Sequence, residues 1–470
     1  MTTRAPNKNA SHDQAQKPRR SRQRGVALLI TLTWIALMVA MVGEFTYGTS
    51  VDTAQAANAR DDLRAHYMAR SAVNLSRLLI KIQARFVDPV MAQAQQMISK
   101  LMGAQSGAGG AGGSNAPMTG GLGISLRVTD YAGPLMGFFG GSKEEVSGLG
   151  SLIGINTAGV KGLGMSSGHF DAEITAEDGK IDLNCGAGLG ETAKQQQTYR
   201  LLLALMLSPR FDRLFSEADS SGQFNTRQDV ARALIDWADI DDRMFTPDGT
   251  GTGSEDYRYD ARADKYRAHD NRYDTIEEIK QVRGVSDAYM EAFQSFLTVY
   301  PNMQAQQGCK VNLGAISNKN GGDCTPILMA VIRATVDPTK AQAADPAIFD
   351  DRRLYPIASV LCDRASAAGF DSLDTITRTL AAPQNAVISD DPRYKLLQSS
   401  QPITINTAEL NNVAFVAPPR VYRIVATGEA GRVKRKITAI VDTRRSLDHP
   451  MTLNVASEKA AGVLQYWREE

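Results

Sequence analysis

The side chains best suited to bind an ion form one acidic group in the middle of the chain. Its eight carboxylates fall within 25 residues, at Asp236, Asp239, Asp241, Asp242, Asp248, Glu255, Asp256 and Asp260. If folding brings such groups together, they repel one another unless a cation neutralises them. Calcium takes six to eight oxygen ligands, so a calcium site is one interpretation and a solvated acidic loop is the other. The spacing is not that of an EF-hand, which has a glycine at its sixth position and a glutamate at its twelfth.

Residues suited to acid–base or nucleophilic catalysis are scattered. The five histidines are His12, His66, His169, His269 and His449, and no nucleophile elbow, P-loop or metalloprotease motif occurs. We therefore expect the chain not to be an enzyme. A membrane-anchored periplasmic hydrolase that uses the acidic group is the alternative of this class.

The cysteines predict oxidised pairs. Cys185, Cys309, Cys324 and Cys362 contain no Cys-x-x-Cys pair, and an even number in an oxidising compartment permits disulfides with three possible connectivities. We favour Cys309 with Cys324, because the segment between them is short, polar and contains glycine. Free buried thiols are the alternative, and the spacing does not favour zinc.

An apolar segment near the N-terminus predicts a membrane helix. From Gly25 to Gly43, 19 residues pass without a charge, and a helix of that length spans the roughly 30 Å of a bilayer's hydrocarbon core. The segment follows four arginines, Arg19, Arg20, Arg22 and Arg24. By the positive-inside rule the N-terminus stays in the cytoplasm and the rest of the chain crosses the membrane.

A cleaved secretory signal is a second interpretation of this segment. Its small-residue site would be Ala54-Gln55-Ala56, which lies more than ten residues beyond Gly43. The small residue that does lie at a boundary is Gly25, between the basic leader and the apolar segment. A plain single-span anchor is the third interpretation.

Length and charge limit the remaining possibilities. With 470 residues and 43% hydrophobic content, the chain is expected to fold as two or three units. Residues 1–24 hold seven basic residues and one acidic residue, so the remainder has a formal net charge of −5. That remainder has no bulk electrostatic attraction to nucleic acid, and we expect none as a partner.

The apolar spacing predicts that the membrane helix continues beyond the bilayer. Its stripe alternates steps of four and three, at Met68, Ala72, Leu75, Leu79, Ile82 and Phe86. Residues 103–165 then hold 19 of the chain's 40 glycines, and we expect most of this segment to be flexible. The exception is an apolar patch, at Leu135, Met136, Phe138 and Phe139, that could dock on the head or on a partner.

Two predicted hairpins enclose a long helical region. The first joins Phe170–Ala176 to Lys180–Asn184, and the second joins Val421–Ala426 to Val433–Val441 through a glycine turn. The region between them contains a helix–turn–helix unit around Gly284. Because the hairpins lie more than 200 residues apart, we predict one α+β head interrupted by an inserted α-helical domain.

The order of several short motifs resembles that of the K-class minor pseudopilins of the type II (general) secretion pathway. The motifs are Arg24-Gly25-Val26-Ala27-Leu28-Leu29-Ile30, Tyr67-Met68-Ala69-Arg70-Ser71-Ala72, Glu177-Asp178-Gly179-Lys180-Ile181-Asp182-Leu183-Asn184, Leu234-Ile235-Asp236-Trp237-Ala238-Asp239-Ile240-Asp241, Glu255-Asp256-Tyr257, the 275–301 hairpin, Ile405-Asn406-Thr407-Ala408 and Tyr466-Trp467-Arg468-Glu469. Most prepilin-like proteins have glutamate where this chain has Ile30, and the K class lacks it. The chain departs from the family in its glycine-rich segment and at Val311-Asn312-Leu313-Gly314.

The resemblance implies a fold, a processing site and a role. A prepilin peptidase would cut after Gly25, and Val26 would be N-methylated. Structural calcium would be bound by Asp239, Asp241, Glu255 and Asp256. The mature subunit would be anchored in the bacterial inner membrane with its head in the periplasm. There it would cap the tip of the pseudopilus, together with I- and J-class minor pseudopilins, and support export of folded proteins across the outer membrane. The inner-membrane secretion platform would be a further partner. A DNA-uptake type IV pilin-like protein is the alternative, and it would need a basic face on the helical insertion.

The predicted organisation is pilin-like, with a long N-terminal transmembrane helix and an antiparallel sheet. Its parts are a basic prepilin leader (1–25), a transmembrane segment (26–43), the periplasmic part of the helix (44–102), a glycine-rich insertion (103–165), the first strands of the head (166–185), the inserted helical domain (186–400), the returning strands (401–445) and a C-terminal tail (446–470).

Overall fold

The computed structural model describes residues 23–90, 93, 127–140, 168–188, 190–218, 222, 224–251, 253–256, 259, 266–300, 308–319, 322–336, 345–386, 397, 400–443 and 462–470. The chain divides into two compact units, Met1–Leu63 and Arg64–Glu470. Nearly all of the predicted leader, 1–25, lies outside the described residues, as does much of the glycine-rich segment.

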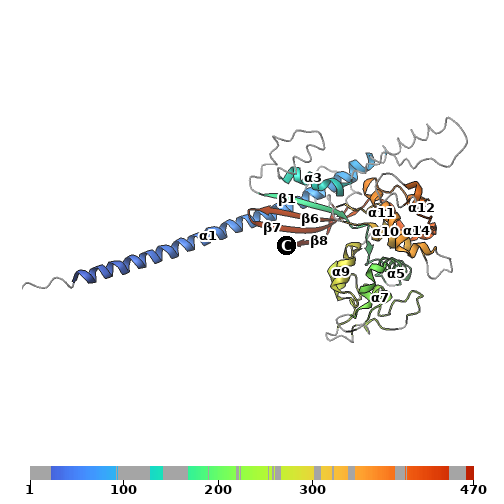
Figure 1. Cartoon of the computed structure of the whole chain (residues 1–470), viewed down its shortest axis with the longest axis horizontal. Coiled ribbons are helices and arrows are strands. Elements are labelled where there is room, and N and C mark those ends of the chain that lie inside the picture. The colour runs from blue at the N-terminus through green and yellow to red at the C-terminus, as the bar shows by residue number, and fades with distance from the viewer. Residues whose placement is uncertain are drawn as a thin grey trace, which may run out of the picture. The chain divides into compact units, whose positions relative to one another are not determined.

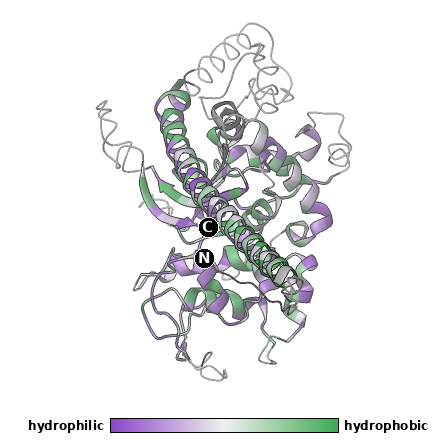
Figure 2. Cartoon of the chain, turned by 90° about the vertical axis from the view of Figure 1, so that its left-hand side faces the viewer, coloured by the Kyte–Doolittle hydropathy of each residue, from purple (hydrophilic) through white to green (hydrophobic). Residues whose placement is uncertain are grey.

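The described part of the first unit is helical. Helix α1 runs from Gln23 to Ile82, and its apolar side chains are exposed, by 57% at Val26 and 62% at Val42. In the part of the chain that the structure describes, one helix, Gly25–Val90, is long and apolar enough to cross a membrane. Figure 2 shows hydrophobic residues along the N-terminal part of α1. The predicted span at 26–43 lies in this helix.

In the second unit, α1 buries one face. Three residues of the predicted stripe, Met68, Ala72 and Leu79, are buried, whereas Phe86 is 55% exposed. The stripe ends early because Gln83–Val87 form a π-helix, η1, whose wider turn changes which side of the helix faces the core.

A four-stranded antiparallel sheet forms the head, in the order β1-β6-β7-β8 (Figure 1). The strands are β1 His169–Ala176, β6 Val421–Ala430, β7 Val433–Asp442 and β8 Val463–Glu469. The predicted second hairpin is confirmed, because β6 and β7 pair up to Ala430↔Val433. Pairing of β1 with β6 brings Ala176 opposite Tyr422, so the chain leaves the sheet and returns to it at neighbouring positions.

The predicted first hairpin is wrong. Strand β1 pairs with β6, and β2, Ile181–Asp182, pairs in parallel with β3, Leu297–Thr298. The turn after β1 directs the chain away from the sheet, because Glu177 and Asp178 bind the start of β6 instead of closing a hairpin. The local alternation of residues predicted the strands but not their partners.

The end of the chain is also more ordered than predicted. Of the expected tail at 446–470, residues Val463–Glu469 form β8 and pair with β7. A free edge on β7 would leave a row of backbone groups without partners, and β8 supplies them. Residues 444–461 lie outside the described part of the chain.

One face of the sheet is covered by α1 and by helix α3, Val128–Gly140. The inward side chains alternate along the strands, as Phe170, Ala172 and Ile174 of β1 do. Helix α3 lies within the segment expected to be flexible, and Met136 of the predicted docking patch is fully buried in this core. The prediction that the patch docks on the head therefore holds for Met136.

Gly428 allows α1 to lie directly against the sheet. A Cβ atom on Gly428 of β6 would lie 2.1 Å from the carbonyl oxygen of Ala65 and 2.5 Å from the amide nitrogen of Ala69. No side chain fits in that space, so the contact between helix and strand requires glycine.

The region between β1 and β6 is mainly helical and has its own core. Its further elements are α5 Thr192–Met206, η2 Pro209–Phe211, α6 Asp212–Ser216, α7 Arg227–Asp236, η3 Ile276–Gln281, α9 Asp287–Phe293, η4 Gln294–Phe296, β4 Val311–Asn312, α10 Thr325–Ala334, η5 Pro346–Phe349, α11 Asp351–Ala367, α12 Asp374–Ala381, η6 Pro383–Ala386, α14 Thr407–Val413 and β5 Ala414–Phe415. Every residue of α10 is buried. Helix α14 and β5 lie within the range expected to hold returning strands, yet Leu410 and Ala414 pack in the core of the insertion.

The predicted disulfide between Cys309 and Cys324 is wrong. Cys185 bonds to Cys309 and Cys324 bonds to Cys362, each with a Cα–Cα distance of 5.5 Å. The segment after Cys309 is not a free polar loop, because its apolar side chains are buried in the core, at Val311, Leu313 and Ile316. Cys324 precedes α10 and Cys362 lies in the neighbouring helix α11, so packing of the two helices decides that pair.

Candidate metal centre

Helix α7 brings the first acidic side chain into the interior. A capping box begins the helix: the Thr226 hydroxyl accepts from the Asp229 N–H, and the Asp229 carboxylate accepts from the Thr226 N–H. The helix ends at Asp236, and the turn that follows places Asp239 beside it. The start and length of α7 thus fix the positions of both carboxylates.

Three carboxylates converge at the end of α7. One oxygen from each of Asp236, Asp239 and Glu255 lies within 4.8 Å of the others. All three residues are buried, and Glu255 and Asp236 are 0% exposed. Glu255 reaches the group from a turn next to the Arg243↔Ser254 bridge, which closes the acidic loop on itself.

Hydrogen bonds satisfy only part of this group. The Phe245 N–H donates to Asp236 Oδ1 at 2.7 Å, and Gln195 Nε2 donates to Asp239 Oδ2 at 2.8 Å. Asp239 Oδ1 and both oxygens of Glu255 accept no hydrogen bond from any residue that the structure describes. Buried carboxylate oxygens without donors are costly unless a cation or a proton occupies the space between them.

Burial and mutual repulsion change the acidity of the group. Burial raises the pKa of Asp239, and the charges of Asp236 and Asp241 raise it further. Burial likewise raises the pKa of Glu255, followed by the charges of Asp239 and Asp236. The group therefore binds protons readily in the absence of a cation, and a divalent cation would compete with those protons.

The structure brings together two of the four predicted ligands. Asp239 and Glu255 belong to the group, whereas Asp241 and Asp256 lie outside it. Asp241 Oδ1 accepts from the Arg243 N–H at 3.0 Å. Asp256 Oδ1 accepts from the Ala268 N–H at 3.2 Å, and its other oxygen faces Arg267 at 3.6 Å.

Sequence reasoning did not select Asp236 as a ligand, although it noted the residue in the acidic group. The available signal was its place in the last turn of α7, three residues before Asp239 and next to the buried Trp237. Acidic residues at that spacing point from one helix end toward the same space. A carboxylate in a buried turn is a stronger candidate than one in the exposed loop beyond it.

A second layer of contacts holds the centre. Trp237 Nε1 donates to Glu278 Oε1 at 2.9 Å, and Glu278 also faces His269 at 3.0 Å. Next to His269, Asp270 has a positive φ of 48°, and its pKa is raised by burial and by the charges of Asp256 and Asp242. The hydrogen bond from Trp237 to Glu278 thus links the end of α7 to the 266–278 segment.

The donor set fits a hard divalent cation. Three buried carboxylates offer up to six oxygen atoms, and calcium takes six to eight oxygen ligands at about 2.3–2.6 Å. The oxygen atoms of Asp239 and Glu255 that lack donors are where such an ion would bind. No histidine or cysteine belongs to this group of described residues, so its chemistry favours calcium over zinc.

The predicted processing residues lie at the start of α1. Gly25 has no described atom within 4 Å of where a Cβ would lie, and Val26 is exposed. Ile30, at the position where the resemblance expected no carboxylate, is 52% exposed on the same helix.

Comparisons with known proteins agree with the sequence motifs over the acidic part of the chain. Residues 182–302 match the family model described as type II secretion system (T2SS), protein K. A comparison with curated proteins finds no match. Among solved structures, the chain is similar to the crystal structure of the GspK-GspI-GspJ complex from enterotoxigenic Escherichia coli Type 2 Secretion System. The identity is 14% and the TM-score 0.37, over 65% of this chain and 80% of that chain. The family match confirms the predicted resemblance over residues 182–302, and the structural similarity is too low to add to it.

Proposed function

We propose that this chain, whose residues 182–302 match protein K of the type II secretion system, is a minor pseudopilin that caps the tip of the pseudopilus. The family match carries the proposal. It is supported by an α+β head that is interrupted between Ala176 and Val421, and by one N-terminal helix long and apolar enough to cross a membrane. The role is assembly and not catalysis, and its result is export of folded proteins across the outer membrane.

Processing at the N-terminus would prepare the subunit for assembly. A prepilin peptidase cuts after Gly25, and the new N-terminal Val26 is methylated. The basic leader keeps this end in the cytoplasm, so the helix spans the inner membrane and the head lies in the periplasm. Ile30 has no carboxylate to pair with the terminal amine of a neighbouring subunit, and this suits a position at the end of the filament.

The partners would be the I- and J-class minor pseudopilins and the inner-membrane secretion platform. This part of the proposal follows from the match of residues 182–302 to protein K of the type II secretion system. In this chain the insertion enlarges the head at the end of the sheet where Ala176 of β1 lies opposite Tyr422 of β6. That bulk would leave no room for a further subunit above it, which is the basis of capping.

Calcium would stabilise the insertion of this subunit. The ligands on which the proposal rests are Asp236, Asp239 and Glu255, because these three carboxylates converge and are buried. The resemblance adds Asp241 and Asp256, which lie outside that group. A bound ion would neutralise the carboxylates and join the end of α7 to the loop that carries Glu255.

The mass of the mature N-terminus tests the proposal. The chain is produced in a host with an active type II secretion system and purified from the inner membrane. We expect an N-terminal peptide that begins at methylated Val26. A chain that begins after Ala56 would be a secreted protein, and an uncut chain would be a plain anchor.

A shortened chain tests capping. Because the Glu177 N–H donates to the Val421 carbonyl at 2.9 Å, residues 178–420 can be replaced by Asn-Gly, which forms a two-residue hairpin turn. We expect this variant to be inserted and cut at Gly25 but not to support secretion. Secretion at the normal level by the matured short chain would rule out capping by the insertion.

A further inference from the structure

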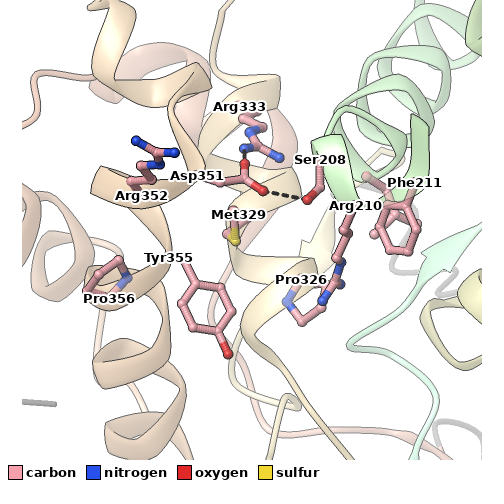
Figure 3. Close-up of a pocket in the computed structure, with 11 residues that line it drawn as sticks. Ser208, Arg210, Phe211, Pro326, Met329, Arg333, Asp351, Arg352, Tyr355 and Pro356 are labelled. Carbon is pink, nitrogen blue, oxygen red and sulfur yellow. Dashed lines mark hydrogen bonds and ion pairs between the residues drawn. The ribbon is translucent and has the colours of Figure 1, made fainter. Parts of the chain in front are cut away.

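A groove on the inserted domain shares no lining residue with the acidic group. Its volume is about 290 Å³, and it lies between the segment after α5 and helices α10 and α11. Figure 3 shows Arg210 and Phe211 on one side of it and Arg352, Tyr355 and Pro356 on the other. Ligand pockets usually measure about 300–1,000 Å³, so this groove suits one or two side chains of a peptide better than a cofactor.

An ion pair between the buried Arg333 and the partly exposed Asp351 builds one wall of the groove. Asp351 accepts from the guanidinium of Arg333 and from the hydroxyl of Ser208. Arg333 is 3% exposed and also donates from Nε to the Ile348 carbonyl at 3.2 Å. The charge of Asp351 is therefore paired with that of Arg333.

Two arginines leave the rim positively charged. Arg210 and Arg352 are exposed, and neither guanidinium forms an ion pair with a residue that the structure describes. The Arg210 guanidinium carbon lies 4.5 Å from the centroid of the Phe211 ring, which helps to hold its position. A cation on each side of the groove, with no ion pair to a described residue, attracts an anion.

The space between these arginines is largely apolar. Met329 and Leu205 line it, and Tyr355 is 47% exposed beside them. Pro356 lies inside α11 and also lines the groove.

We propose that this groove binds an extended peptide segment of another polypeptide, one that carries a carboxylate next to a large apolar side chain. The carboxylate pairs with Arg210 at the rim, Arg352 adds positive charge on the other side, and the apolar side chain packs against Tyr355 and Met329. Arginine, tyrosine and methionine are enriched at protein interfaces, and arginine and tyrosine at their energetic hot spots. The proposal goes beyond the pseudopilin role and does not depend on calcium.

Labelled peptides test the proposal by fluorescence anisotropy with the full chain in detergent. The probe is acetyl-Ser-Leu-Asp-Phe-Gly carrying a fluorophore. One comparison peptide has Lys in place of Asp, and the other has Ser in place of Leu and Phe. We expect saturable binding of the probe, at least about tenfold tighter than either comparison peptide, which is the effect of one charge-assisted hydrogen bond. Binding should weaken as salt is raised, because the arginines are exposed.

Charge reversal provides the matched variants. R210E together with R352E should weaken binding of the probe by about 10- to 100-fold. R378E makes the same change on the exposed surface of α12 in the same domain and should leave the affinity unchanged. Equal affinity in the reversed and control variants, equal binding of the Lys peptide, or no saturation with any peptide would overturn the proposal. None of these results changes the mass of the mature N-terminus, so this test and that of the pseudopilin role fail independently.

Discussion

The carboxylate of Asp178 joins the two ends of the insertion by accepting from the backbone N–H of Val421 at 2.9 Å, across 243 residues. Its other oxygen accepts from the Arg420 N–H at 2.7 Å. Beside it, Glu177 is buried and pairs with Arg423 at 2.6 Å. Burial alone would raise the pKa of Glu177, but the charges of Lys180 and Arg423 lower it to about 2. The junction between head and insertion is thus made by two consecutive acidic residues.

Replacing Asp178 should loosen this junction. D178A leaves two backbone N–H groups without their acceptor, which costs about 1–3 kcal/mol of unfolding free energy for each buried group. D178N keeps one acceptor oxygen and should lose about half as much. Urea denaturation measures the loss, and limited proteolysis should show new cuts near residues 178 and 420. A D178A chain as stable as the parent would show that the junction does not contribute to stability.

Gly428 should tolerate no side chain. In G428A the new Cβ would overlap the backbone of Ala65 and Ala69, so α1 must move off the sheet, and overpacking of this kind costs about 1–3 kcal/mol or more. Hydrogen exchange should rise in the 65–80 part of α1. The matched control is G133A on α3, where no atom lies within 4 Å of the new Cβ. G133A should be neutral or slightly stabilising.

Calcium should stabilise the chain through Glu255. Ligand at about 100 times its dissociation constant adds about 2.7 kcal/mol to the unfolding free energy. We therefore expect about 1 mM calcium to raise Tm measurably when the dissociation constant of the site is lower than this concentration. Burial, followed by the charges of Asp239 and Asp236, raises the pKa of Glu255 to about 11, so this carboxyl group is protonated in chelator. E255Q should therefore have about the Tm of the parent in chelator and show little response to calcium. D248N changes an exposed residue of the acidic loop and should respond as the parent does. A normal calcium response in E255Q would exclude this site.

The same group predicts a pH dependence of stability in chelator. Burial and the charges of Asp236 and Asp241 raise the pKa of Asp239 to about 8 in the folded chain. The folded chain binds the proton of Asp239 more tightly than the unfolded chain does, in which the pKa of aspartate is about 4. The bound proton therefore stabilises the folded chain, and this stability is lost as the pH rises through about 8. Tm in chelator should therefore fall between pH 6 and pH 9, and calcium should reduce the fall. A flat profile in chelator would contradict the shared burial of the three carboxylates.

Peptide mapping without reduction checks the disulfides. We expect linked peptides that contain Cys185 with Cys309 and Cys324 with Cys362. Replacing both cysteines of either pair by alanine should lower the unfolding free energy by about 2–5 kcal/mol. A peptide that links Cys309 to Cys324 would contradict the pairing.

The sequence predicted elements better than their partners. The β6–β7 hairpin was predictable because its pairing is local and its turn contains Gly431, with a φ of 59°. The β1–β6 and β7–β8 pairings connect distant segments, and periodicity contains no information about them. Likewise, Cys324 and Cys362 meet because α10 packs on α11, which spacing along the chain does not reveal.

The candidate site was predicted in outline. Residue type and density were enough to find the acidic group and two members of its buried core, Asp239 and Glu255. Separating Asp236 from Asp256 requires burial, because both are acidic residues next to an aromatic residue in the sequence. Asp236 ends a helix that packs inward, whereas Asp256 faces Arg267 near the surface.

The position of the insertion between β1 and β6 affects the entropy cost of completing the sheet. Bringing Ala176 next to Tyr422 through an unfolded loop carries an entropy cost that grows with the length of the loop. Once the insertion has its core and its disulfides, the two strand ends are held close together and that cost is small. We therefore expect the insertion to fold before the sheet is completed, so changes that slow its folding should also delay the pairing of β1 with β6.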